Sequence, residues 1–60
     1  MKTFRVTFEV FKNDGSKEYR PVVVEAGTKK LAAVRAMIEI NKIDGYSTLY
    51  KNIHTIVEVA

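Results

Sequence analysis

The chain has 60 residues, a formal net charge of +3 from ten basic and seven acidic residues, and neither Cys nor Trp. Its length allows one small domain over residues 1–60, and a chain of this size buries only about 60% of its unfolded surface when it folds. Without Cys there is no disulfide or thiolate metal site, which indicates a reducing, cytoplasmic compartment and favours self-association as the source of further stability. No apolar run approaches the roughly 18 residues of a membrane span, so we expect no membrane segment.

The first predicted element is a half-buried strand over residues 3–12, in which apolar and polar residues alternate. A turn follows at Asn13-Asp14-Gly15, where Gly15 can take the positive φ that closes a three-residue loop with a bulge. A second strand is predicted over residues 17–26. Pro21 cannot donate a hydrogen bond to a neighbouring strand, so this second strand should lie at an edge of the sheet.

The register of this hairpin depends on the length of its loop. A three-residue loop sets Val6 opposite Val22, so that apolar side chains meet on one face. A two-residue loop instead pairs Glu9 with Arg20. We favour the first register, because it places the apolar residues of both strands toward one core.

A helix is predicted over residues 28–44. Thr28 is a suitable N-cap, and Gly45 suits the left-handed position that follows a helix. Arg35, Glu39 and Lys42 fall on one narrow polar stripe of this helix, and apolar residues occupy most of the rest of its surface. A helix on the surface of a monomer usually has a narrower apolar face, so this helix has enough apolar surface for two contacts.

The last predicted element is a strand over residues 53–60, which makes the order ββαβ. A right-handed crossover through the helix places this strand beside the first strand and antiparallel to it. The predicted fold class is therefore α+β, with one helix packed on a three-stranded antiparallel sheet of order 2-1-3. The last strand then forms the second edge of the sheet, and residues 53–60 contain no Pro or Lys that would discourage pairing.

The residue inventory argues against an enzyme and against a bound metal or cofactor. His54 is the only imidazole, and it lies in a strand with no Ser or carboxylate arranged as in a catalytic triad. His54 and Glu58 would share a strand face but lie about 13 Å apart, which is too far to hold one ion. We therefore expect no catalytic residue, no metal site and no cofactor.

Two basic features indicate an alternative function, which is binding to nucleic acid. Lys29 and Lys30 stand at the start of the helix, where backbone N–H groups attract anions. On the sheet face opposite the helix, the preferred register gathers aromatic and basic side chains that suit base stacking and phosphate contacts. The candidate residues for an anion or a nucleic acid are Thr28, Lys29, Lys30, Arg5, Lys17, Arg20, Phe11 and Tyr19. A charge of +3 is small for this purpose, and acidic residues lie between the basic ones.

The surplus of apolar surface favours a homodimer, formed either through the helix or through the last strand. Sixty residues cannot enclose a helix on all sides, and an unprotected edge strand usually pairs with another strand. We expect the last strand to turn His54, Ile56 and Glu58 to the face opposite the helix. The candidate residues for a dimer or partner interface are Met37, Ile40, His54, Ile56, Glu58 and Val59.

These observations together favour a non-enzymatic, intracellular protein-interaction module. We expect a homodimer that binds another protein and modulates or inhibits it, and the size of the chain fits a phage-encoded protein of this kind. Nucleic-acid binding is the alternative, and it requires the basic residues to converge on one surface of the folded chain.

Overall fold

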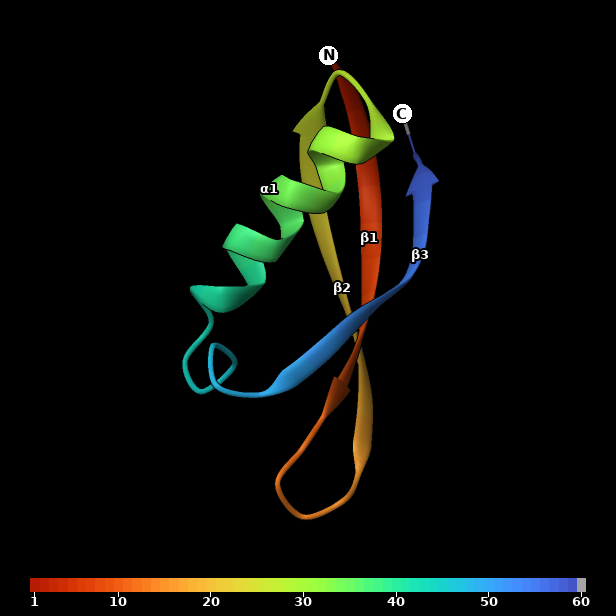
Figure 1. Ribbon diagram of the computed structural model, residues 1–60. Coiled ribbons are helices and arrows are strands. Elements are labelled where there is room, and N and C mark those ends of the chain that lie inside the picture. Colours follow the sequence, from red (N-terminus) through yellow and green to blue (C-terminus); the bar gives the residue numbers. More distant parts are fainter. Residues whose placement is uncertain (60) are drawn as a thin grey trace.

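The computed structural model describes residues 1–59, and Ala60, where the last predicted strand ends, lies outside the described residues. The elements follow the predicted order: β1 is Lys2–Phe11, β2 is Lys17–Ala26, α1 is Lys29–Asn41 and β3 is Tyr50–Glu58. The strands form one antiparallel sheet of order β2-β1-β3, and α1 lies across one of its faces (Figure 1). The predicted α+β fold with sheet order 2-1-3 is confirmed.

The hairpin between β1 and β2 has the three-residue loop. The Lys12 N–H donates to the Ser16 carbonyl oxygen over 2.9 Å, and the Gly15 N–H donates to the Lys12 carbonyl oxygen over 3.1 Å. Gly15 has a φ of +90°, so the residue that closes the loop is the one that tolerates left-handed backbone. The loop therefore has the geometry that the sequence predicts.

The register of the hairpin follows from this loop. Val6 lies opposite Val22, as predicted, and Glu9 lies opposite Tyr19. The alternative pairing of Glu9 with Arg20 is therefore wrong. β2 is an edge strand, so Pro21 stands where its missing N–H costs no bond within the sheet.

The core forms between one face of the sheet and α1. It consists of the apolar residues Phe4, Val6, Phe8, Val10, Val24, Ala26, Ala32, Ala36 and Ile40. β1 contributes most of the large side chains, because it is the central strand and every second residue points toward the helix. Full burial of a Val, Ile or Phe side chain stabilises the fold by about 1.5–3 kcal/mol, so this layer is the main source of stability.

α1 begins one residue later and ends three residues earlier than predicted. Thr28 is its N-cap, because Thr28 Oγ1 accepts a hydrogen bond from the Leu31 N–H over 3.2 Å. Lys42 is the C-cap, and Gly45, with a φ of +83°, lies in the turns beyond it and not directly after the helix. α1 packs mainly on β2 and touches β3 least. No helix in residues 1–59 is long and apolar enough to cross a membrane.

β3 begins three residues earlier than predicted and bends near its middle (Figure 1). Its pairing with β1 shifts at this bend, because Thr7 lies opposite Thr55 while the next residue, Phe8, lies opposite Ile53. His54 is thus one extra residue in β3, which is the arrangement of a β-bulge.

The bulge changes which side chains of β3 face α1. Ile56 lies opposite Val6, and Glu58 lies opposite Phe4, so both share the sheet face that α1 covers. The prediction that Ile56 and Glu58 lie on the face opposite the helix is wrong, because the extra residue reverses the alternation along the strand. His54 itself does lie on the face opposite the helix, where its ring contacts Tyr19.

Candidate functional site

The sheet face opposite α1, which we call the open face, carries two pairs of aromatic rings. Phe11 of β1 and Tyr50 of β3 pack with ring centroids 5.4 Å apart, and Tyr19 of β2 and His54 of β3 pack with centroids 4.9 Å apart. Tyr19 is 50% exposed and Tyr50 is 67% exposed. These rings come from three strands, so the sheet register is what brings them together.

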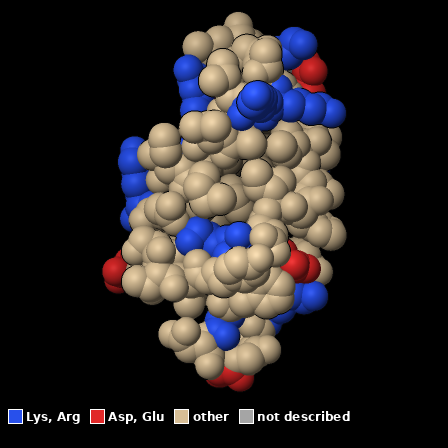
Figure 2. Space-filling view, in the orientation of Figure 1, with Lys and Arg blue, Asp and Glu red and all other residues tan. Residues whose placement is uncertain are grey.

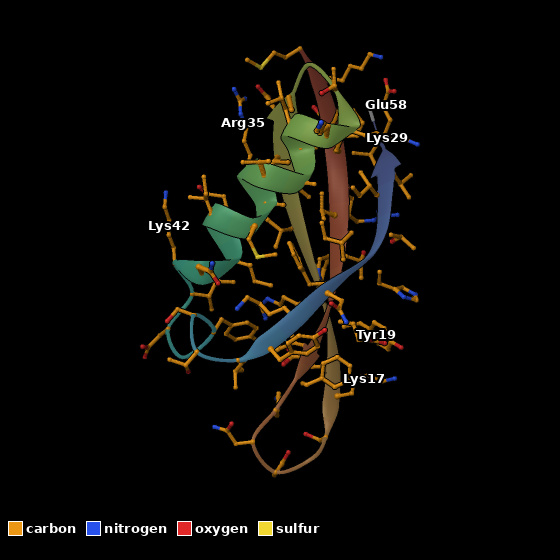
Figure 3. The ribbon with its side chains drawn as sticks, in the orientation of Figure 1. Lys17, Tyr19, Lys29, Arg35, Lys42 and Glu58 are labelled. Atoms are coloured by element: carbon orange, nitrogen blue, oxygen red, sulfur yellow. The ribbon has the colours of Figure 1, made fainter. Side chains whose placement is uncertain are left out.

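Glu9 connects the charged and aromatic groups of the open face. Its Oε2 lies 3.3 Å from Lys17 Nζ and accepts a hydrogen bond from Tyr19 Oη over 3.3 Å. Lys17 Nζ also lies 5.8 Å from the centroid of the Tyr19 ring, and Figure 3 shows both side chains near the hairpin end of the sheet. The hydrogen bond and the negative charge of Glu9 raise the pKa of Lys17. The charge of Lys17 is therefore largely balanced within the face.

The structure separates the basic residues that the sequence suggested for nucleic acid. Arg5, Phe11, Lys17 and Tyr19 share the open face. Arg20 lies on the helix side of the sheet, opposite Phe8, with its guanidinium 5.7 Å from the centroid of the Tyr46 ring.

The remaining three candidates lie at the start of α1, in the other layer of the fold. The Thr28 oxygen is used by the helix cap, and Lys29 and Lys30 are exposed. Figure 2 shows the Lys and Arg side chains of the helix side in several separate places, with uncharged surface between them. The eight candidates therefore do not converge on one surface.

The six candidates for an interface are spread over the core, the helix and β3. Ile40 is 0% exposed, so it is a core residue and not a surface residue, contrary to the prediction. Met37 and Ile56 are half-buried against the core, whereas His54, Glu58 and Val59 are exposed. Only the last three are freely accessible to a partner.

Sequence reasoning missed two sets of exposed side chains. Tyr50 lies before the predicted start of the last strand at residue 53, because Lys51 and Asn52, which are uncommon in strands, follow it. The strand propensity of Tyr50 itself is the local signal for an earlier start. On α1, the buried positions Ala32, Ala36 and Ile40 recur every four residues, which leaves a different apolar stripe exposed. That stripe consists of Leu31, Val34 and Ile38.

The two edges of the sheet differ in how well they are protected. On β2, Pro21 has no N–H, and Arg35 of α1 donates from Nη1 to the Glu25 carbonyl oxygen over 2.7 Å. β3 forms the other edge, and no further strand of residues 1–59 lies beyond it. Lys51 falls within β3 because the strand begins early, but its Nζ donates to the Tyr46 and Leu49 carbonyl oxygens over 2.7 and 2.9 Å. The β3 edge is therefore the less protected one.

A cavity of about 300 Å³ lies between β2 and α1 and is lined by Val23, Val24, Glu25, Arg35, Ile38 and Glu39. It contains no Ser, Thr or His that could act as a nucleophile or base. Within residues 1–59, no group of three His, Asp or Glu side chains is placed to hold a metal ion. Compared with protein-family models, curated proteins and solved structures, the chain matches none of them.

Proposed function

We propose that this protein is a non-enzymatic protein-interaction module that acts as a homodimer and binds and modulates another protein with the open face of its sheet. The observation that supports this most is the uncovered pair of ring contacts, Phe11 with Tyr50 and Tyr19 with His54. Aromatic residues are enriched at protein interfaces, where they bury a large area at a small cost in side-chain entropy.

The charges of the open face favour a protein partner over a nucleic acid. Arg5 and Lys17 are opposed by Glu9 and Glu25 on the same face, so its net charge is close to zero. Affinity for a phosphate backbone comes mainly from several unbalanced cations. We therefore propose a partner surface that is apolar, carries hydrogen-bonding groups and has little net charge. The proposal includes a cytoplasmic location, because a chain without Cys suits a reducing compartment.

The proposal is tested by comparing two double variants with the unchanged protein. Tyr19→Ser with Tyr50→Ser removes the exposed rings of the open face, and Leu31→Ser with Val34→Ser removes a similar exposed apolar area from α1. A partner is first captured from a host lysate and then purified, and its affinity for each variant is measured by calorimetry. We expect the open-face variant to bind at least about tenfold more weakly and the helix variant to bind unchanged. Equal affinity of the open-face variant would overturn the proposal.

The alternative is tested with labelled single- and double-stranded DNA and RNA at two salt concentrations. We expect binding no tighter than about 10⁻⁴ M at low salt, which is the weak end of non-specific binding. Tight, salt-dependent binding that the open-face variant loses would instead support a nucleic-acid function.

A further inference from the structure

At defined positions of β3, the backbone N–H and C=O groups point away from β1, toward the free edge of the sheet. The Val59 N–H donates to the Thr3 carbonyl oxygen over 2.8 Å, so Thr3 directs its backbone toward β3. In an antiparallel ladder the inward and outward positions alternate. Val57 lies opposite Arg5, two residues after Thr3, so it also bonds toward β1. Ile56 and Glu58, the residues on either side of Val57, therefore turn their N–H and C=O groups toward the free edge.

The same reasoning applies on the other side of the bulge. Lys51 lies opposite Val10, and Ile53 lies opposite Phe8. Val10 and Phe8 are at the alternate β1 positions, which bond toward β2, so Lys51 and Ile53 also turn outward. The outward set is Lys51, Ile53, Ile56 and Glu58.

These four positions are symmetric about the bulge. Along β1, Glu58 and Ile56 are level with Phe4 and Val6, whereas Ile53 and Lys51 are level with Phe8 and Val10. The midpoint is level with Thr7, where the bulge lies. A rotation of 180° about an axis that is perpendicular to the sheet at this point therefore exchanges the position of Glu58 with that of Lys51, and the position of Ile56 with that of Ile53.

We propose that a second copy of this chain pairs with the β3 edge, antiparallel, with Ile56 opposite the partner's Ile53 and Glu58 opposite the partner's Lys51. This rests on the homodimer of the proposed function and adds its register. Each dimer then contains two ion pairs and two apolar pairs, all on the helix side. The two helices lie on the same side of the joined sheet, and the two open faces become one surface.

The charges make this register specific. Lys51 Nζ has three N–H donors and gives two of them to the Tyr46 and Leu49 carbonyls, so one remains for a carboxylate. The Lys2 ammonium lies 4.0 Å from the Glu58 carboxylate, and both side chains are about half exposed (56% and 47%), which makes a weak pair. Moving the register by two residues would place Glu58 against Ile53 in one direction or Lys51 against Ile56 in the other, so opposite charges and apolar pairs agree only in the proposed register.

The register is tested by disulfide cross-linking, which is clean because the chain has no Cys. Asn52 and Val57 are exposed and lie on the open face, level with Glu9 and Arg5. In the proposed register Asn52 faces the partner's Val57 in a pair without backbone bonds, with Cα atoms about 4.5 Å apart, which suits a disulfide. Asn52 lies about 14 Å from the partner's Asn52, and Val57 lies equally far from the partner's Val57, which is too far for a disulfide.

We therefore expect Asn52→Cys and Val57→Cys to form a covalent dimer under mild oxidation when the two variants are mixed. Neither variant should cross-link efficiently by itself. Cross-linking of one variant alone would show a different register and overturn the proposal, as would the absence of cross-linking in the mixture.

A second test exchanges the charges. Glu58→Lys and Lys51→Glu should each raise the dimer dissociation constant about tenfold, measured by sedimentation, because both ion pairs become repulsive. A mixture of the two variants should form a heterodimer with nearly the original affinity. Glu39→Lys is the matched control, because Glu39 is an exposed carboxylate paired with Lys42 on α1, and it should leave the dimer unchanged.

These outcomes separate the register from the wider function. A protein that stays monomeric at tens of micromolar would overturn both the β3 pairing and the homodimer of the proposed function, whereas a dimer whose variants fail to restore each other would overturn the β3 pairing alone. The binding of a partner protein by the open face would be unaffected by either result.

Discussion

Ile38 and Ile40 lie two residues apart on α1, and shortening each of them to Val should have different consequences. Ile40 is 0% exposed and belongs to the core, whereas Ile38 is 54% exposed. The two substitutions remove the same methyl group and change the helix propensity equally. Their difference therefore reports how well each side chain is packed.

The expected magnitudes follow from burial. Ile→Val in a packed core costs about 0.5–1.5 kcal/mol, and a half-exposed site should lose less than about 0.5 kcal/mol. A domain of 60 residues has a free energy of unfolding of about 3–9 kcal/mol. Ile40→Ala, at about 2–5 kcal/mol, would remove much of this, so Ile40→Val is the better probe.

The assay is urea denaturation followed by circular dichroism, at one fixed protein concentration because the proposed self-association would make stability depend on concentration. With a slope of about 1 kcal/mol per M of urea, Ile40→Val should lower the midpoint by about 0.5–1.5 M. Ile38→Val should lower it by less than about 0.5 M. Equal shifts would refute the reasoning, because they would mean that the outer side of α1 is packed as tightly as the inner side.

Three further predictions concern the turn, the cap and one acidic residue. Gly15 has a φ of +90°, so Gly15→Ala should lower the free energy of unfolding, measured by urea denaturation, by about 1–2 kcal/mol. Gly27 lies outside the left-handed region, so Gly27→Ala should not lower it. Equal losses for the two variants would contradict this prediction. Thr28→Ala should lower the free energy of unfolding by about 1 kcal/mol in the same assay, and Thr28→Ser should lower it little. Equal losses for the two variants would show that the cap is not the cause. Hydrogen bonds from Tyr46 and Lys12 lower the pKa of Glu18 below its ordinary 4.5. The contribution of Glu18 to the free energy of unfolding is therefore present above pH 4.5 and is lost as the pH falls through the lowered pKa. Glu18→Gln should flatten this acid loss in thermal melts, and a slope as steep as that of the unchanged protein would exclude the effect.

The hairpin was predictable because its determinants are local. The Asn13-Asp14-Gly15 turn selects the loop, and the loop fixes the register. That register correctly places Phe11 and Tyr19 on the open face, and the predicted last strand places His54 there, so three of the four rings of the aromatic site followed from the sequence.

The placement of Ile56, Glu58 and Ile40 depended on contacts that the local sequence does not encode. His54 is chemically ordinary for a strand, and nothing in the sequence around it shows that it forms the bulge that turns Ile56 and Glu58 toward the helix side. The wide apolar surface of α1 likewise gave no reason to bury Ile40 in preference to Ile38. The position of the sheet beneath the helix makes that choice.

The protection of the β2 edge has a consequence for how far assembly can proceed. A sheet with two open edges could add chains without end and grow into a fibre. In the proposed dimer both outer strands of the combined sheet would be β2, where Pro21 lacks a donor and Arg35 occupies the Glu25 carbonyl. Growth beyond two chains would then be disfavoured, so the guanidinium that occupies one β2 carbonyl would also help to limit the size of the proposed assembly.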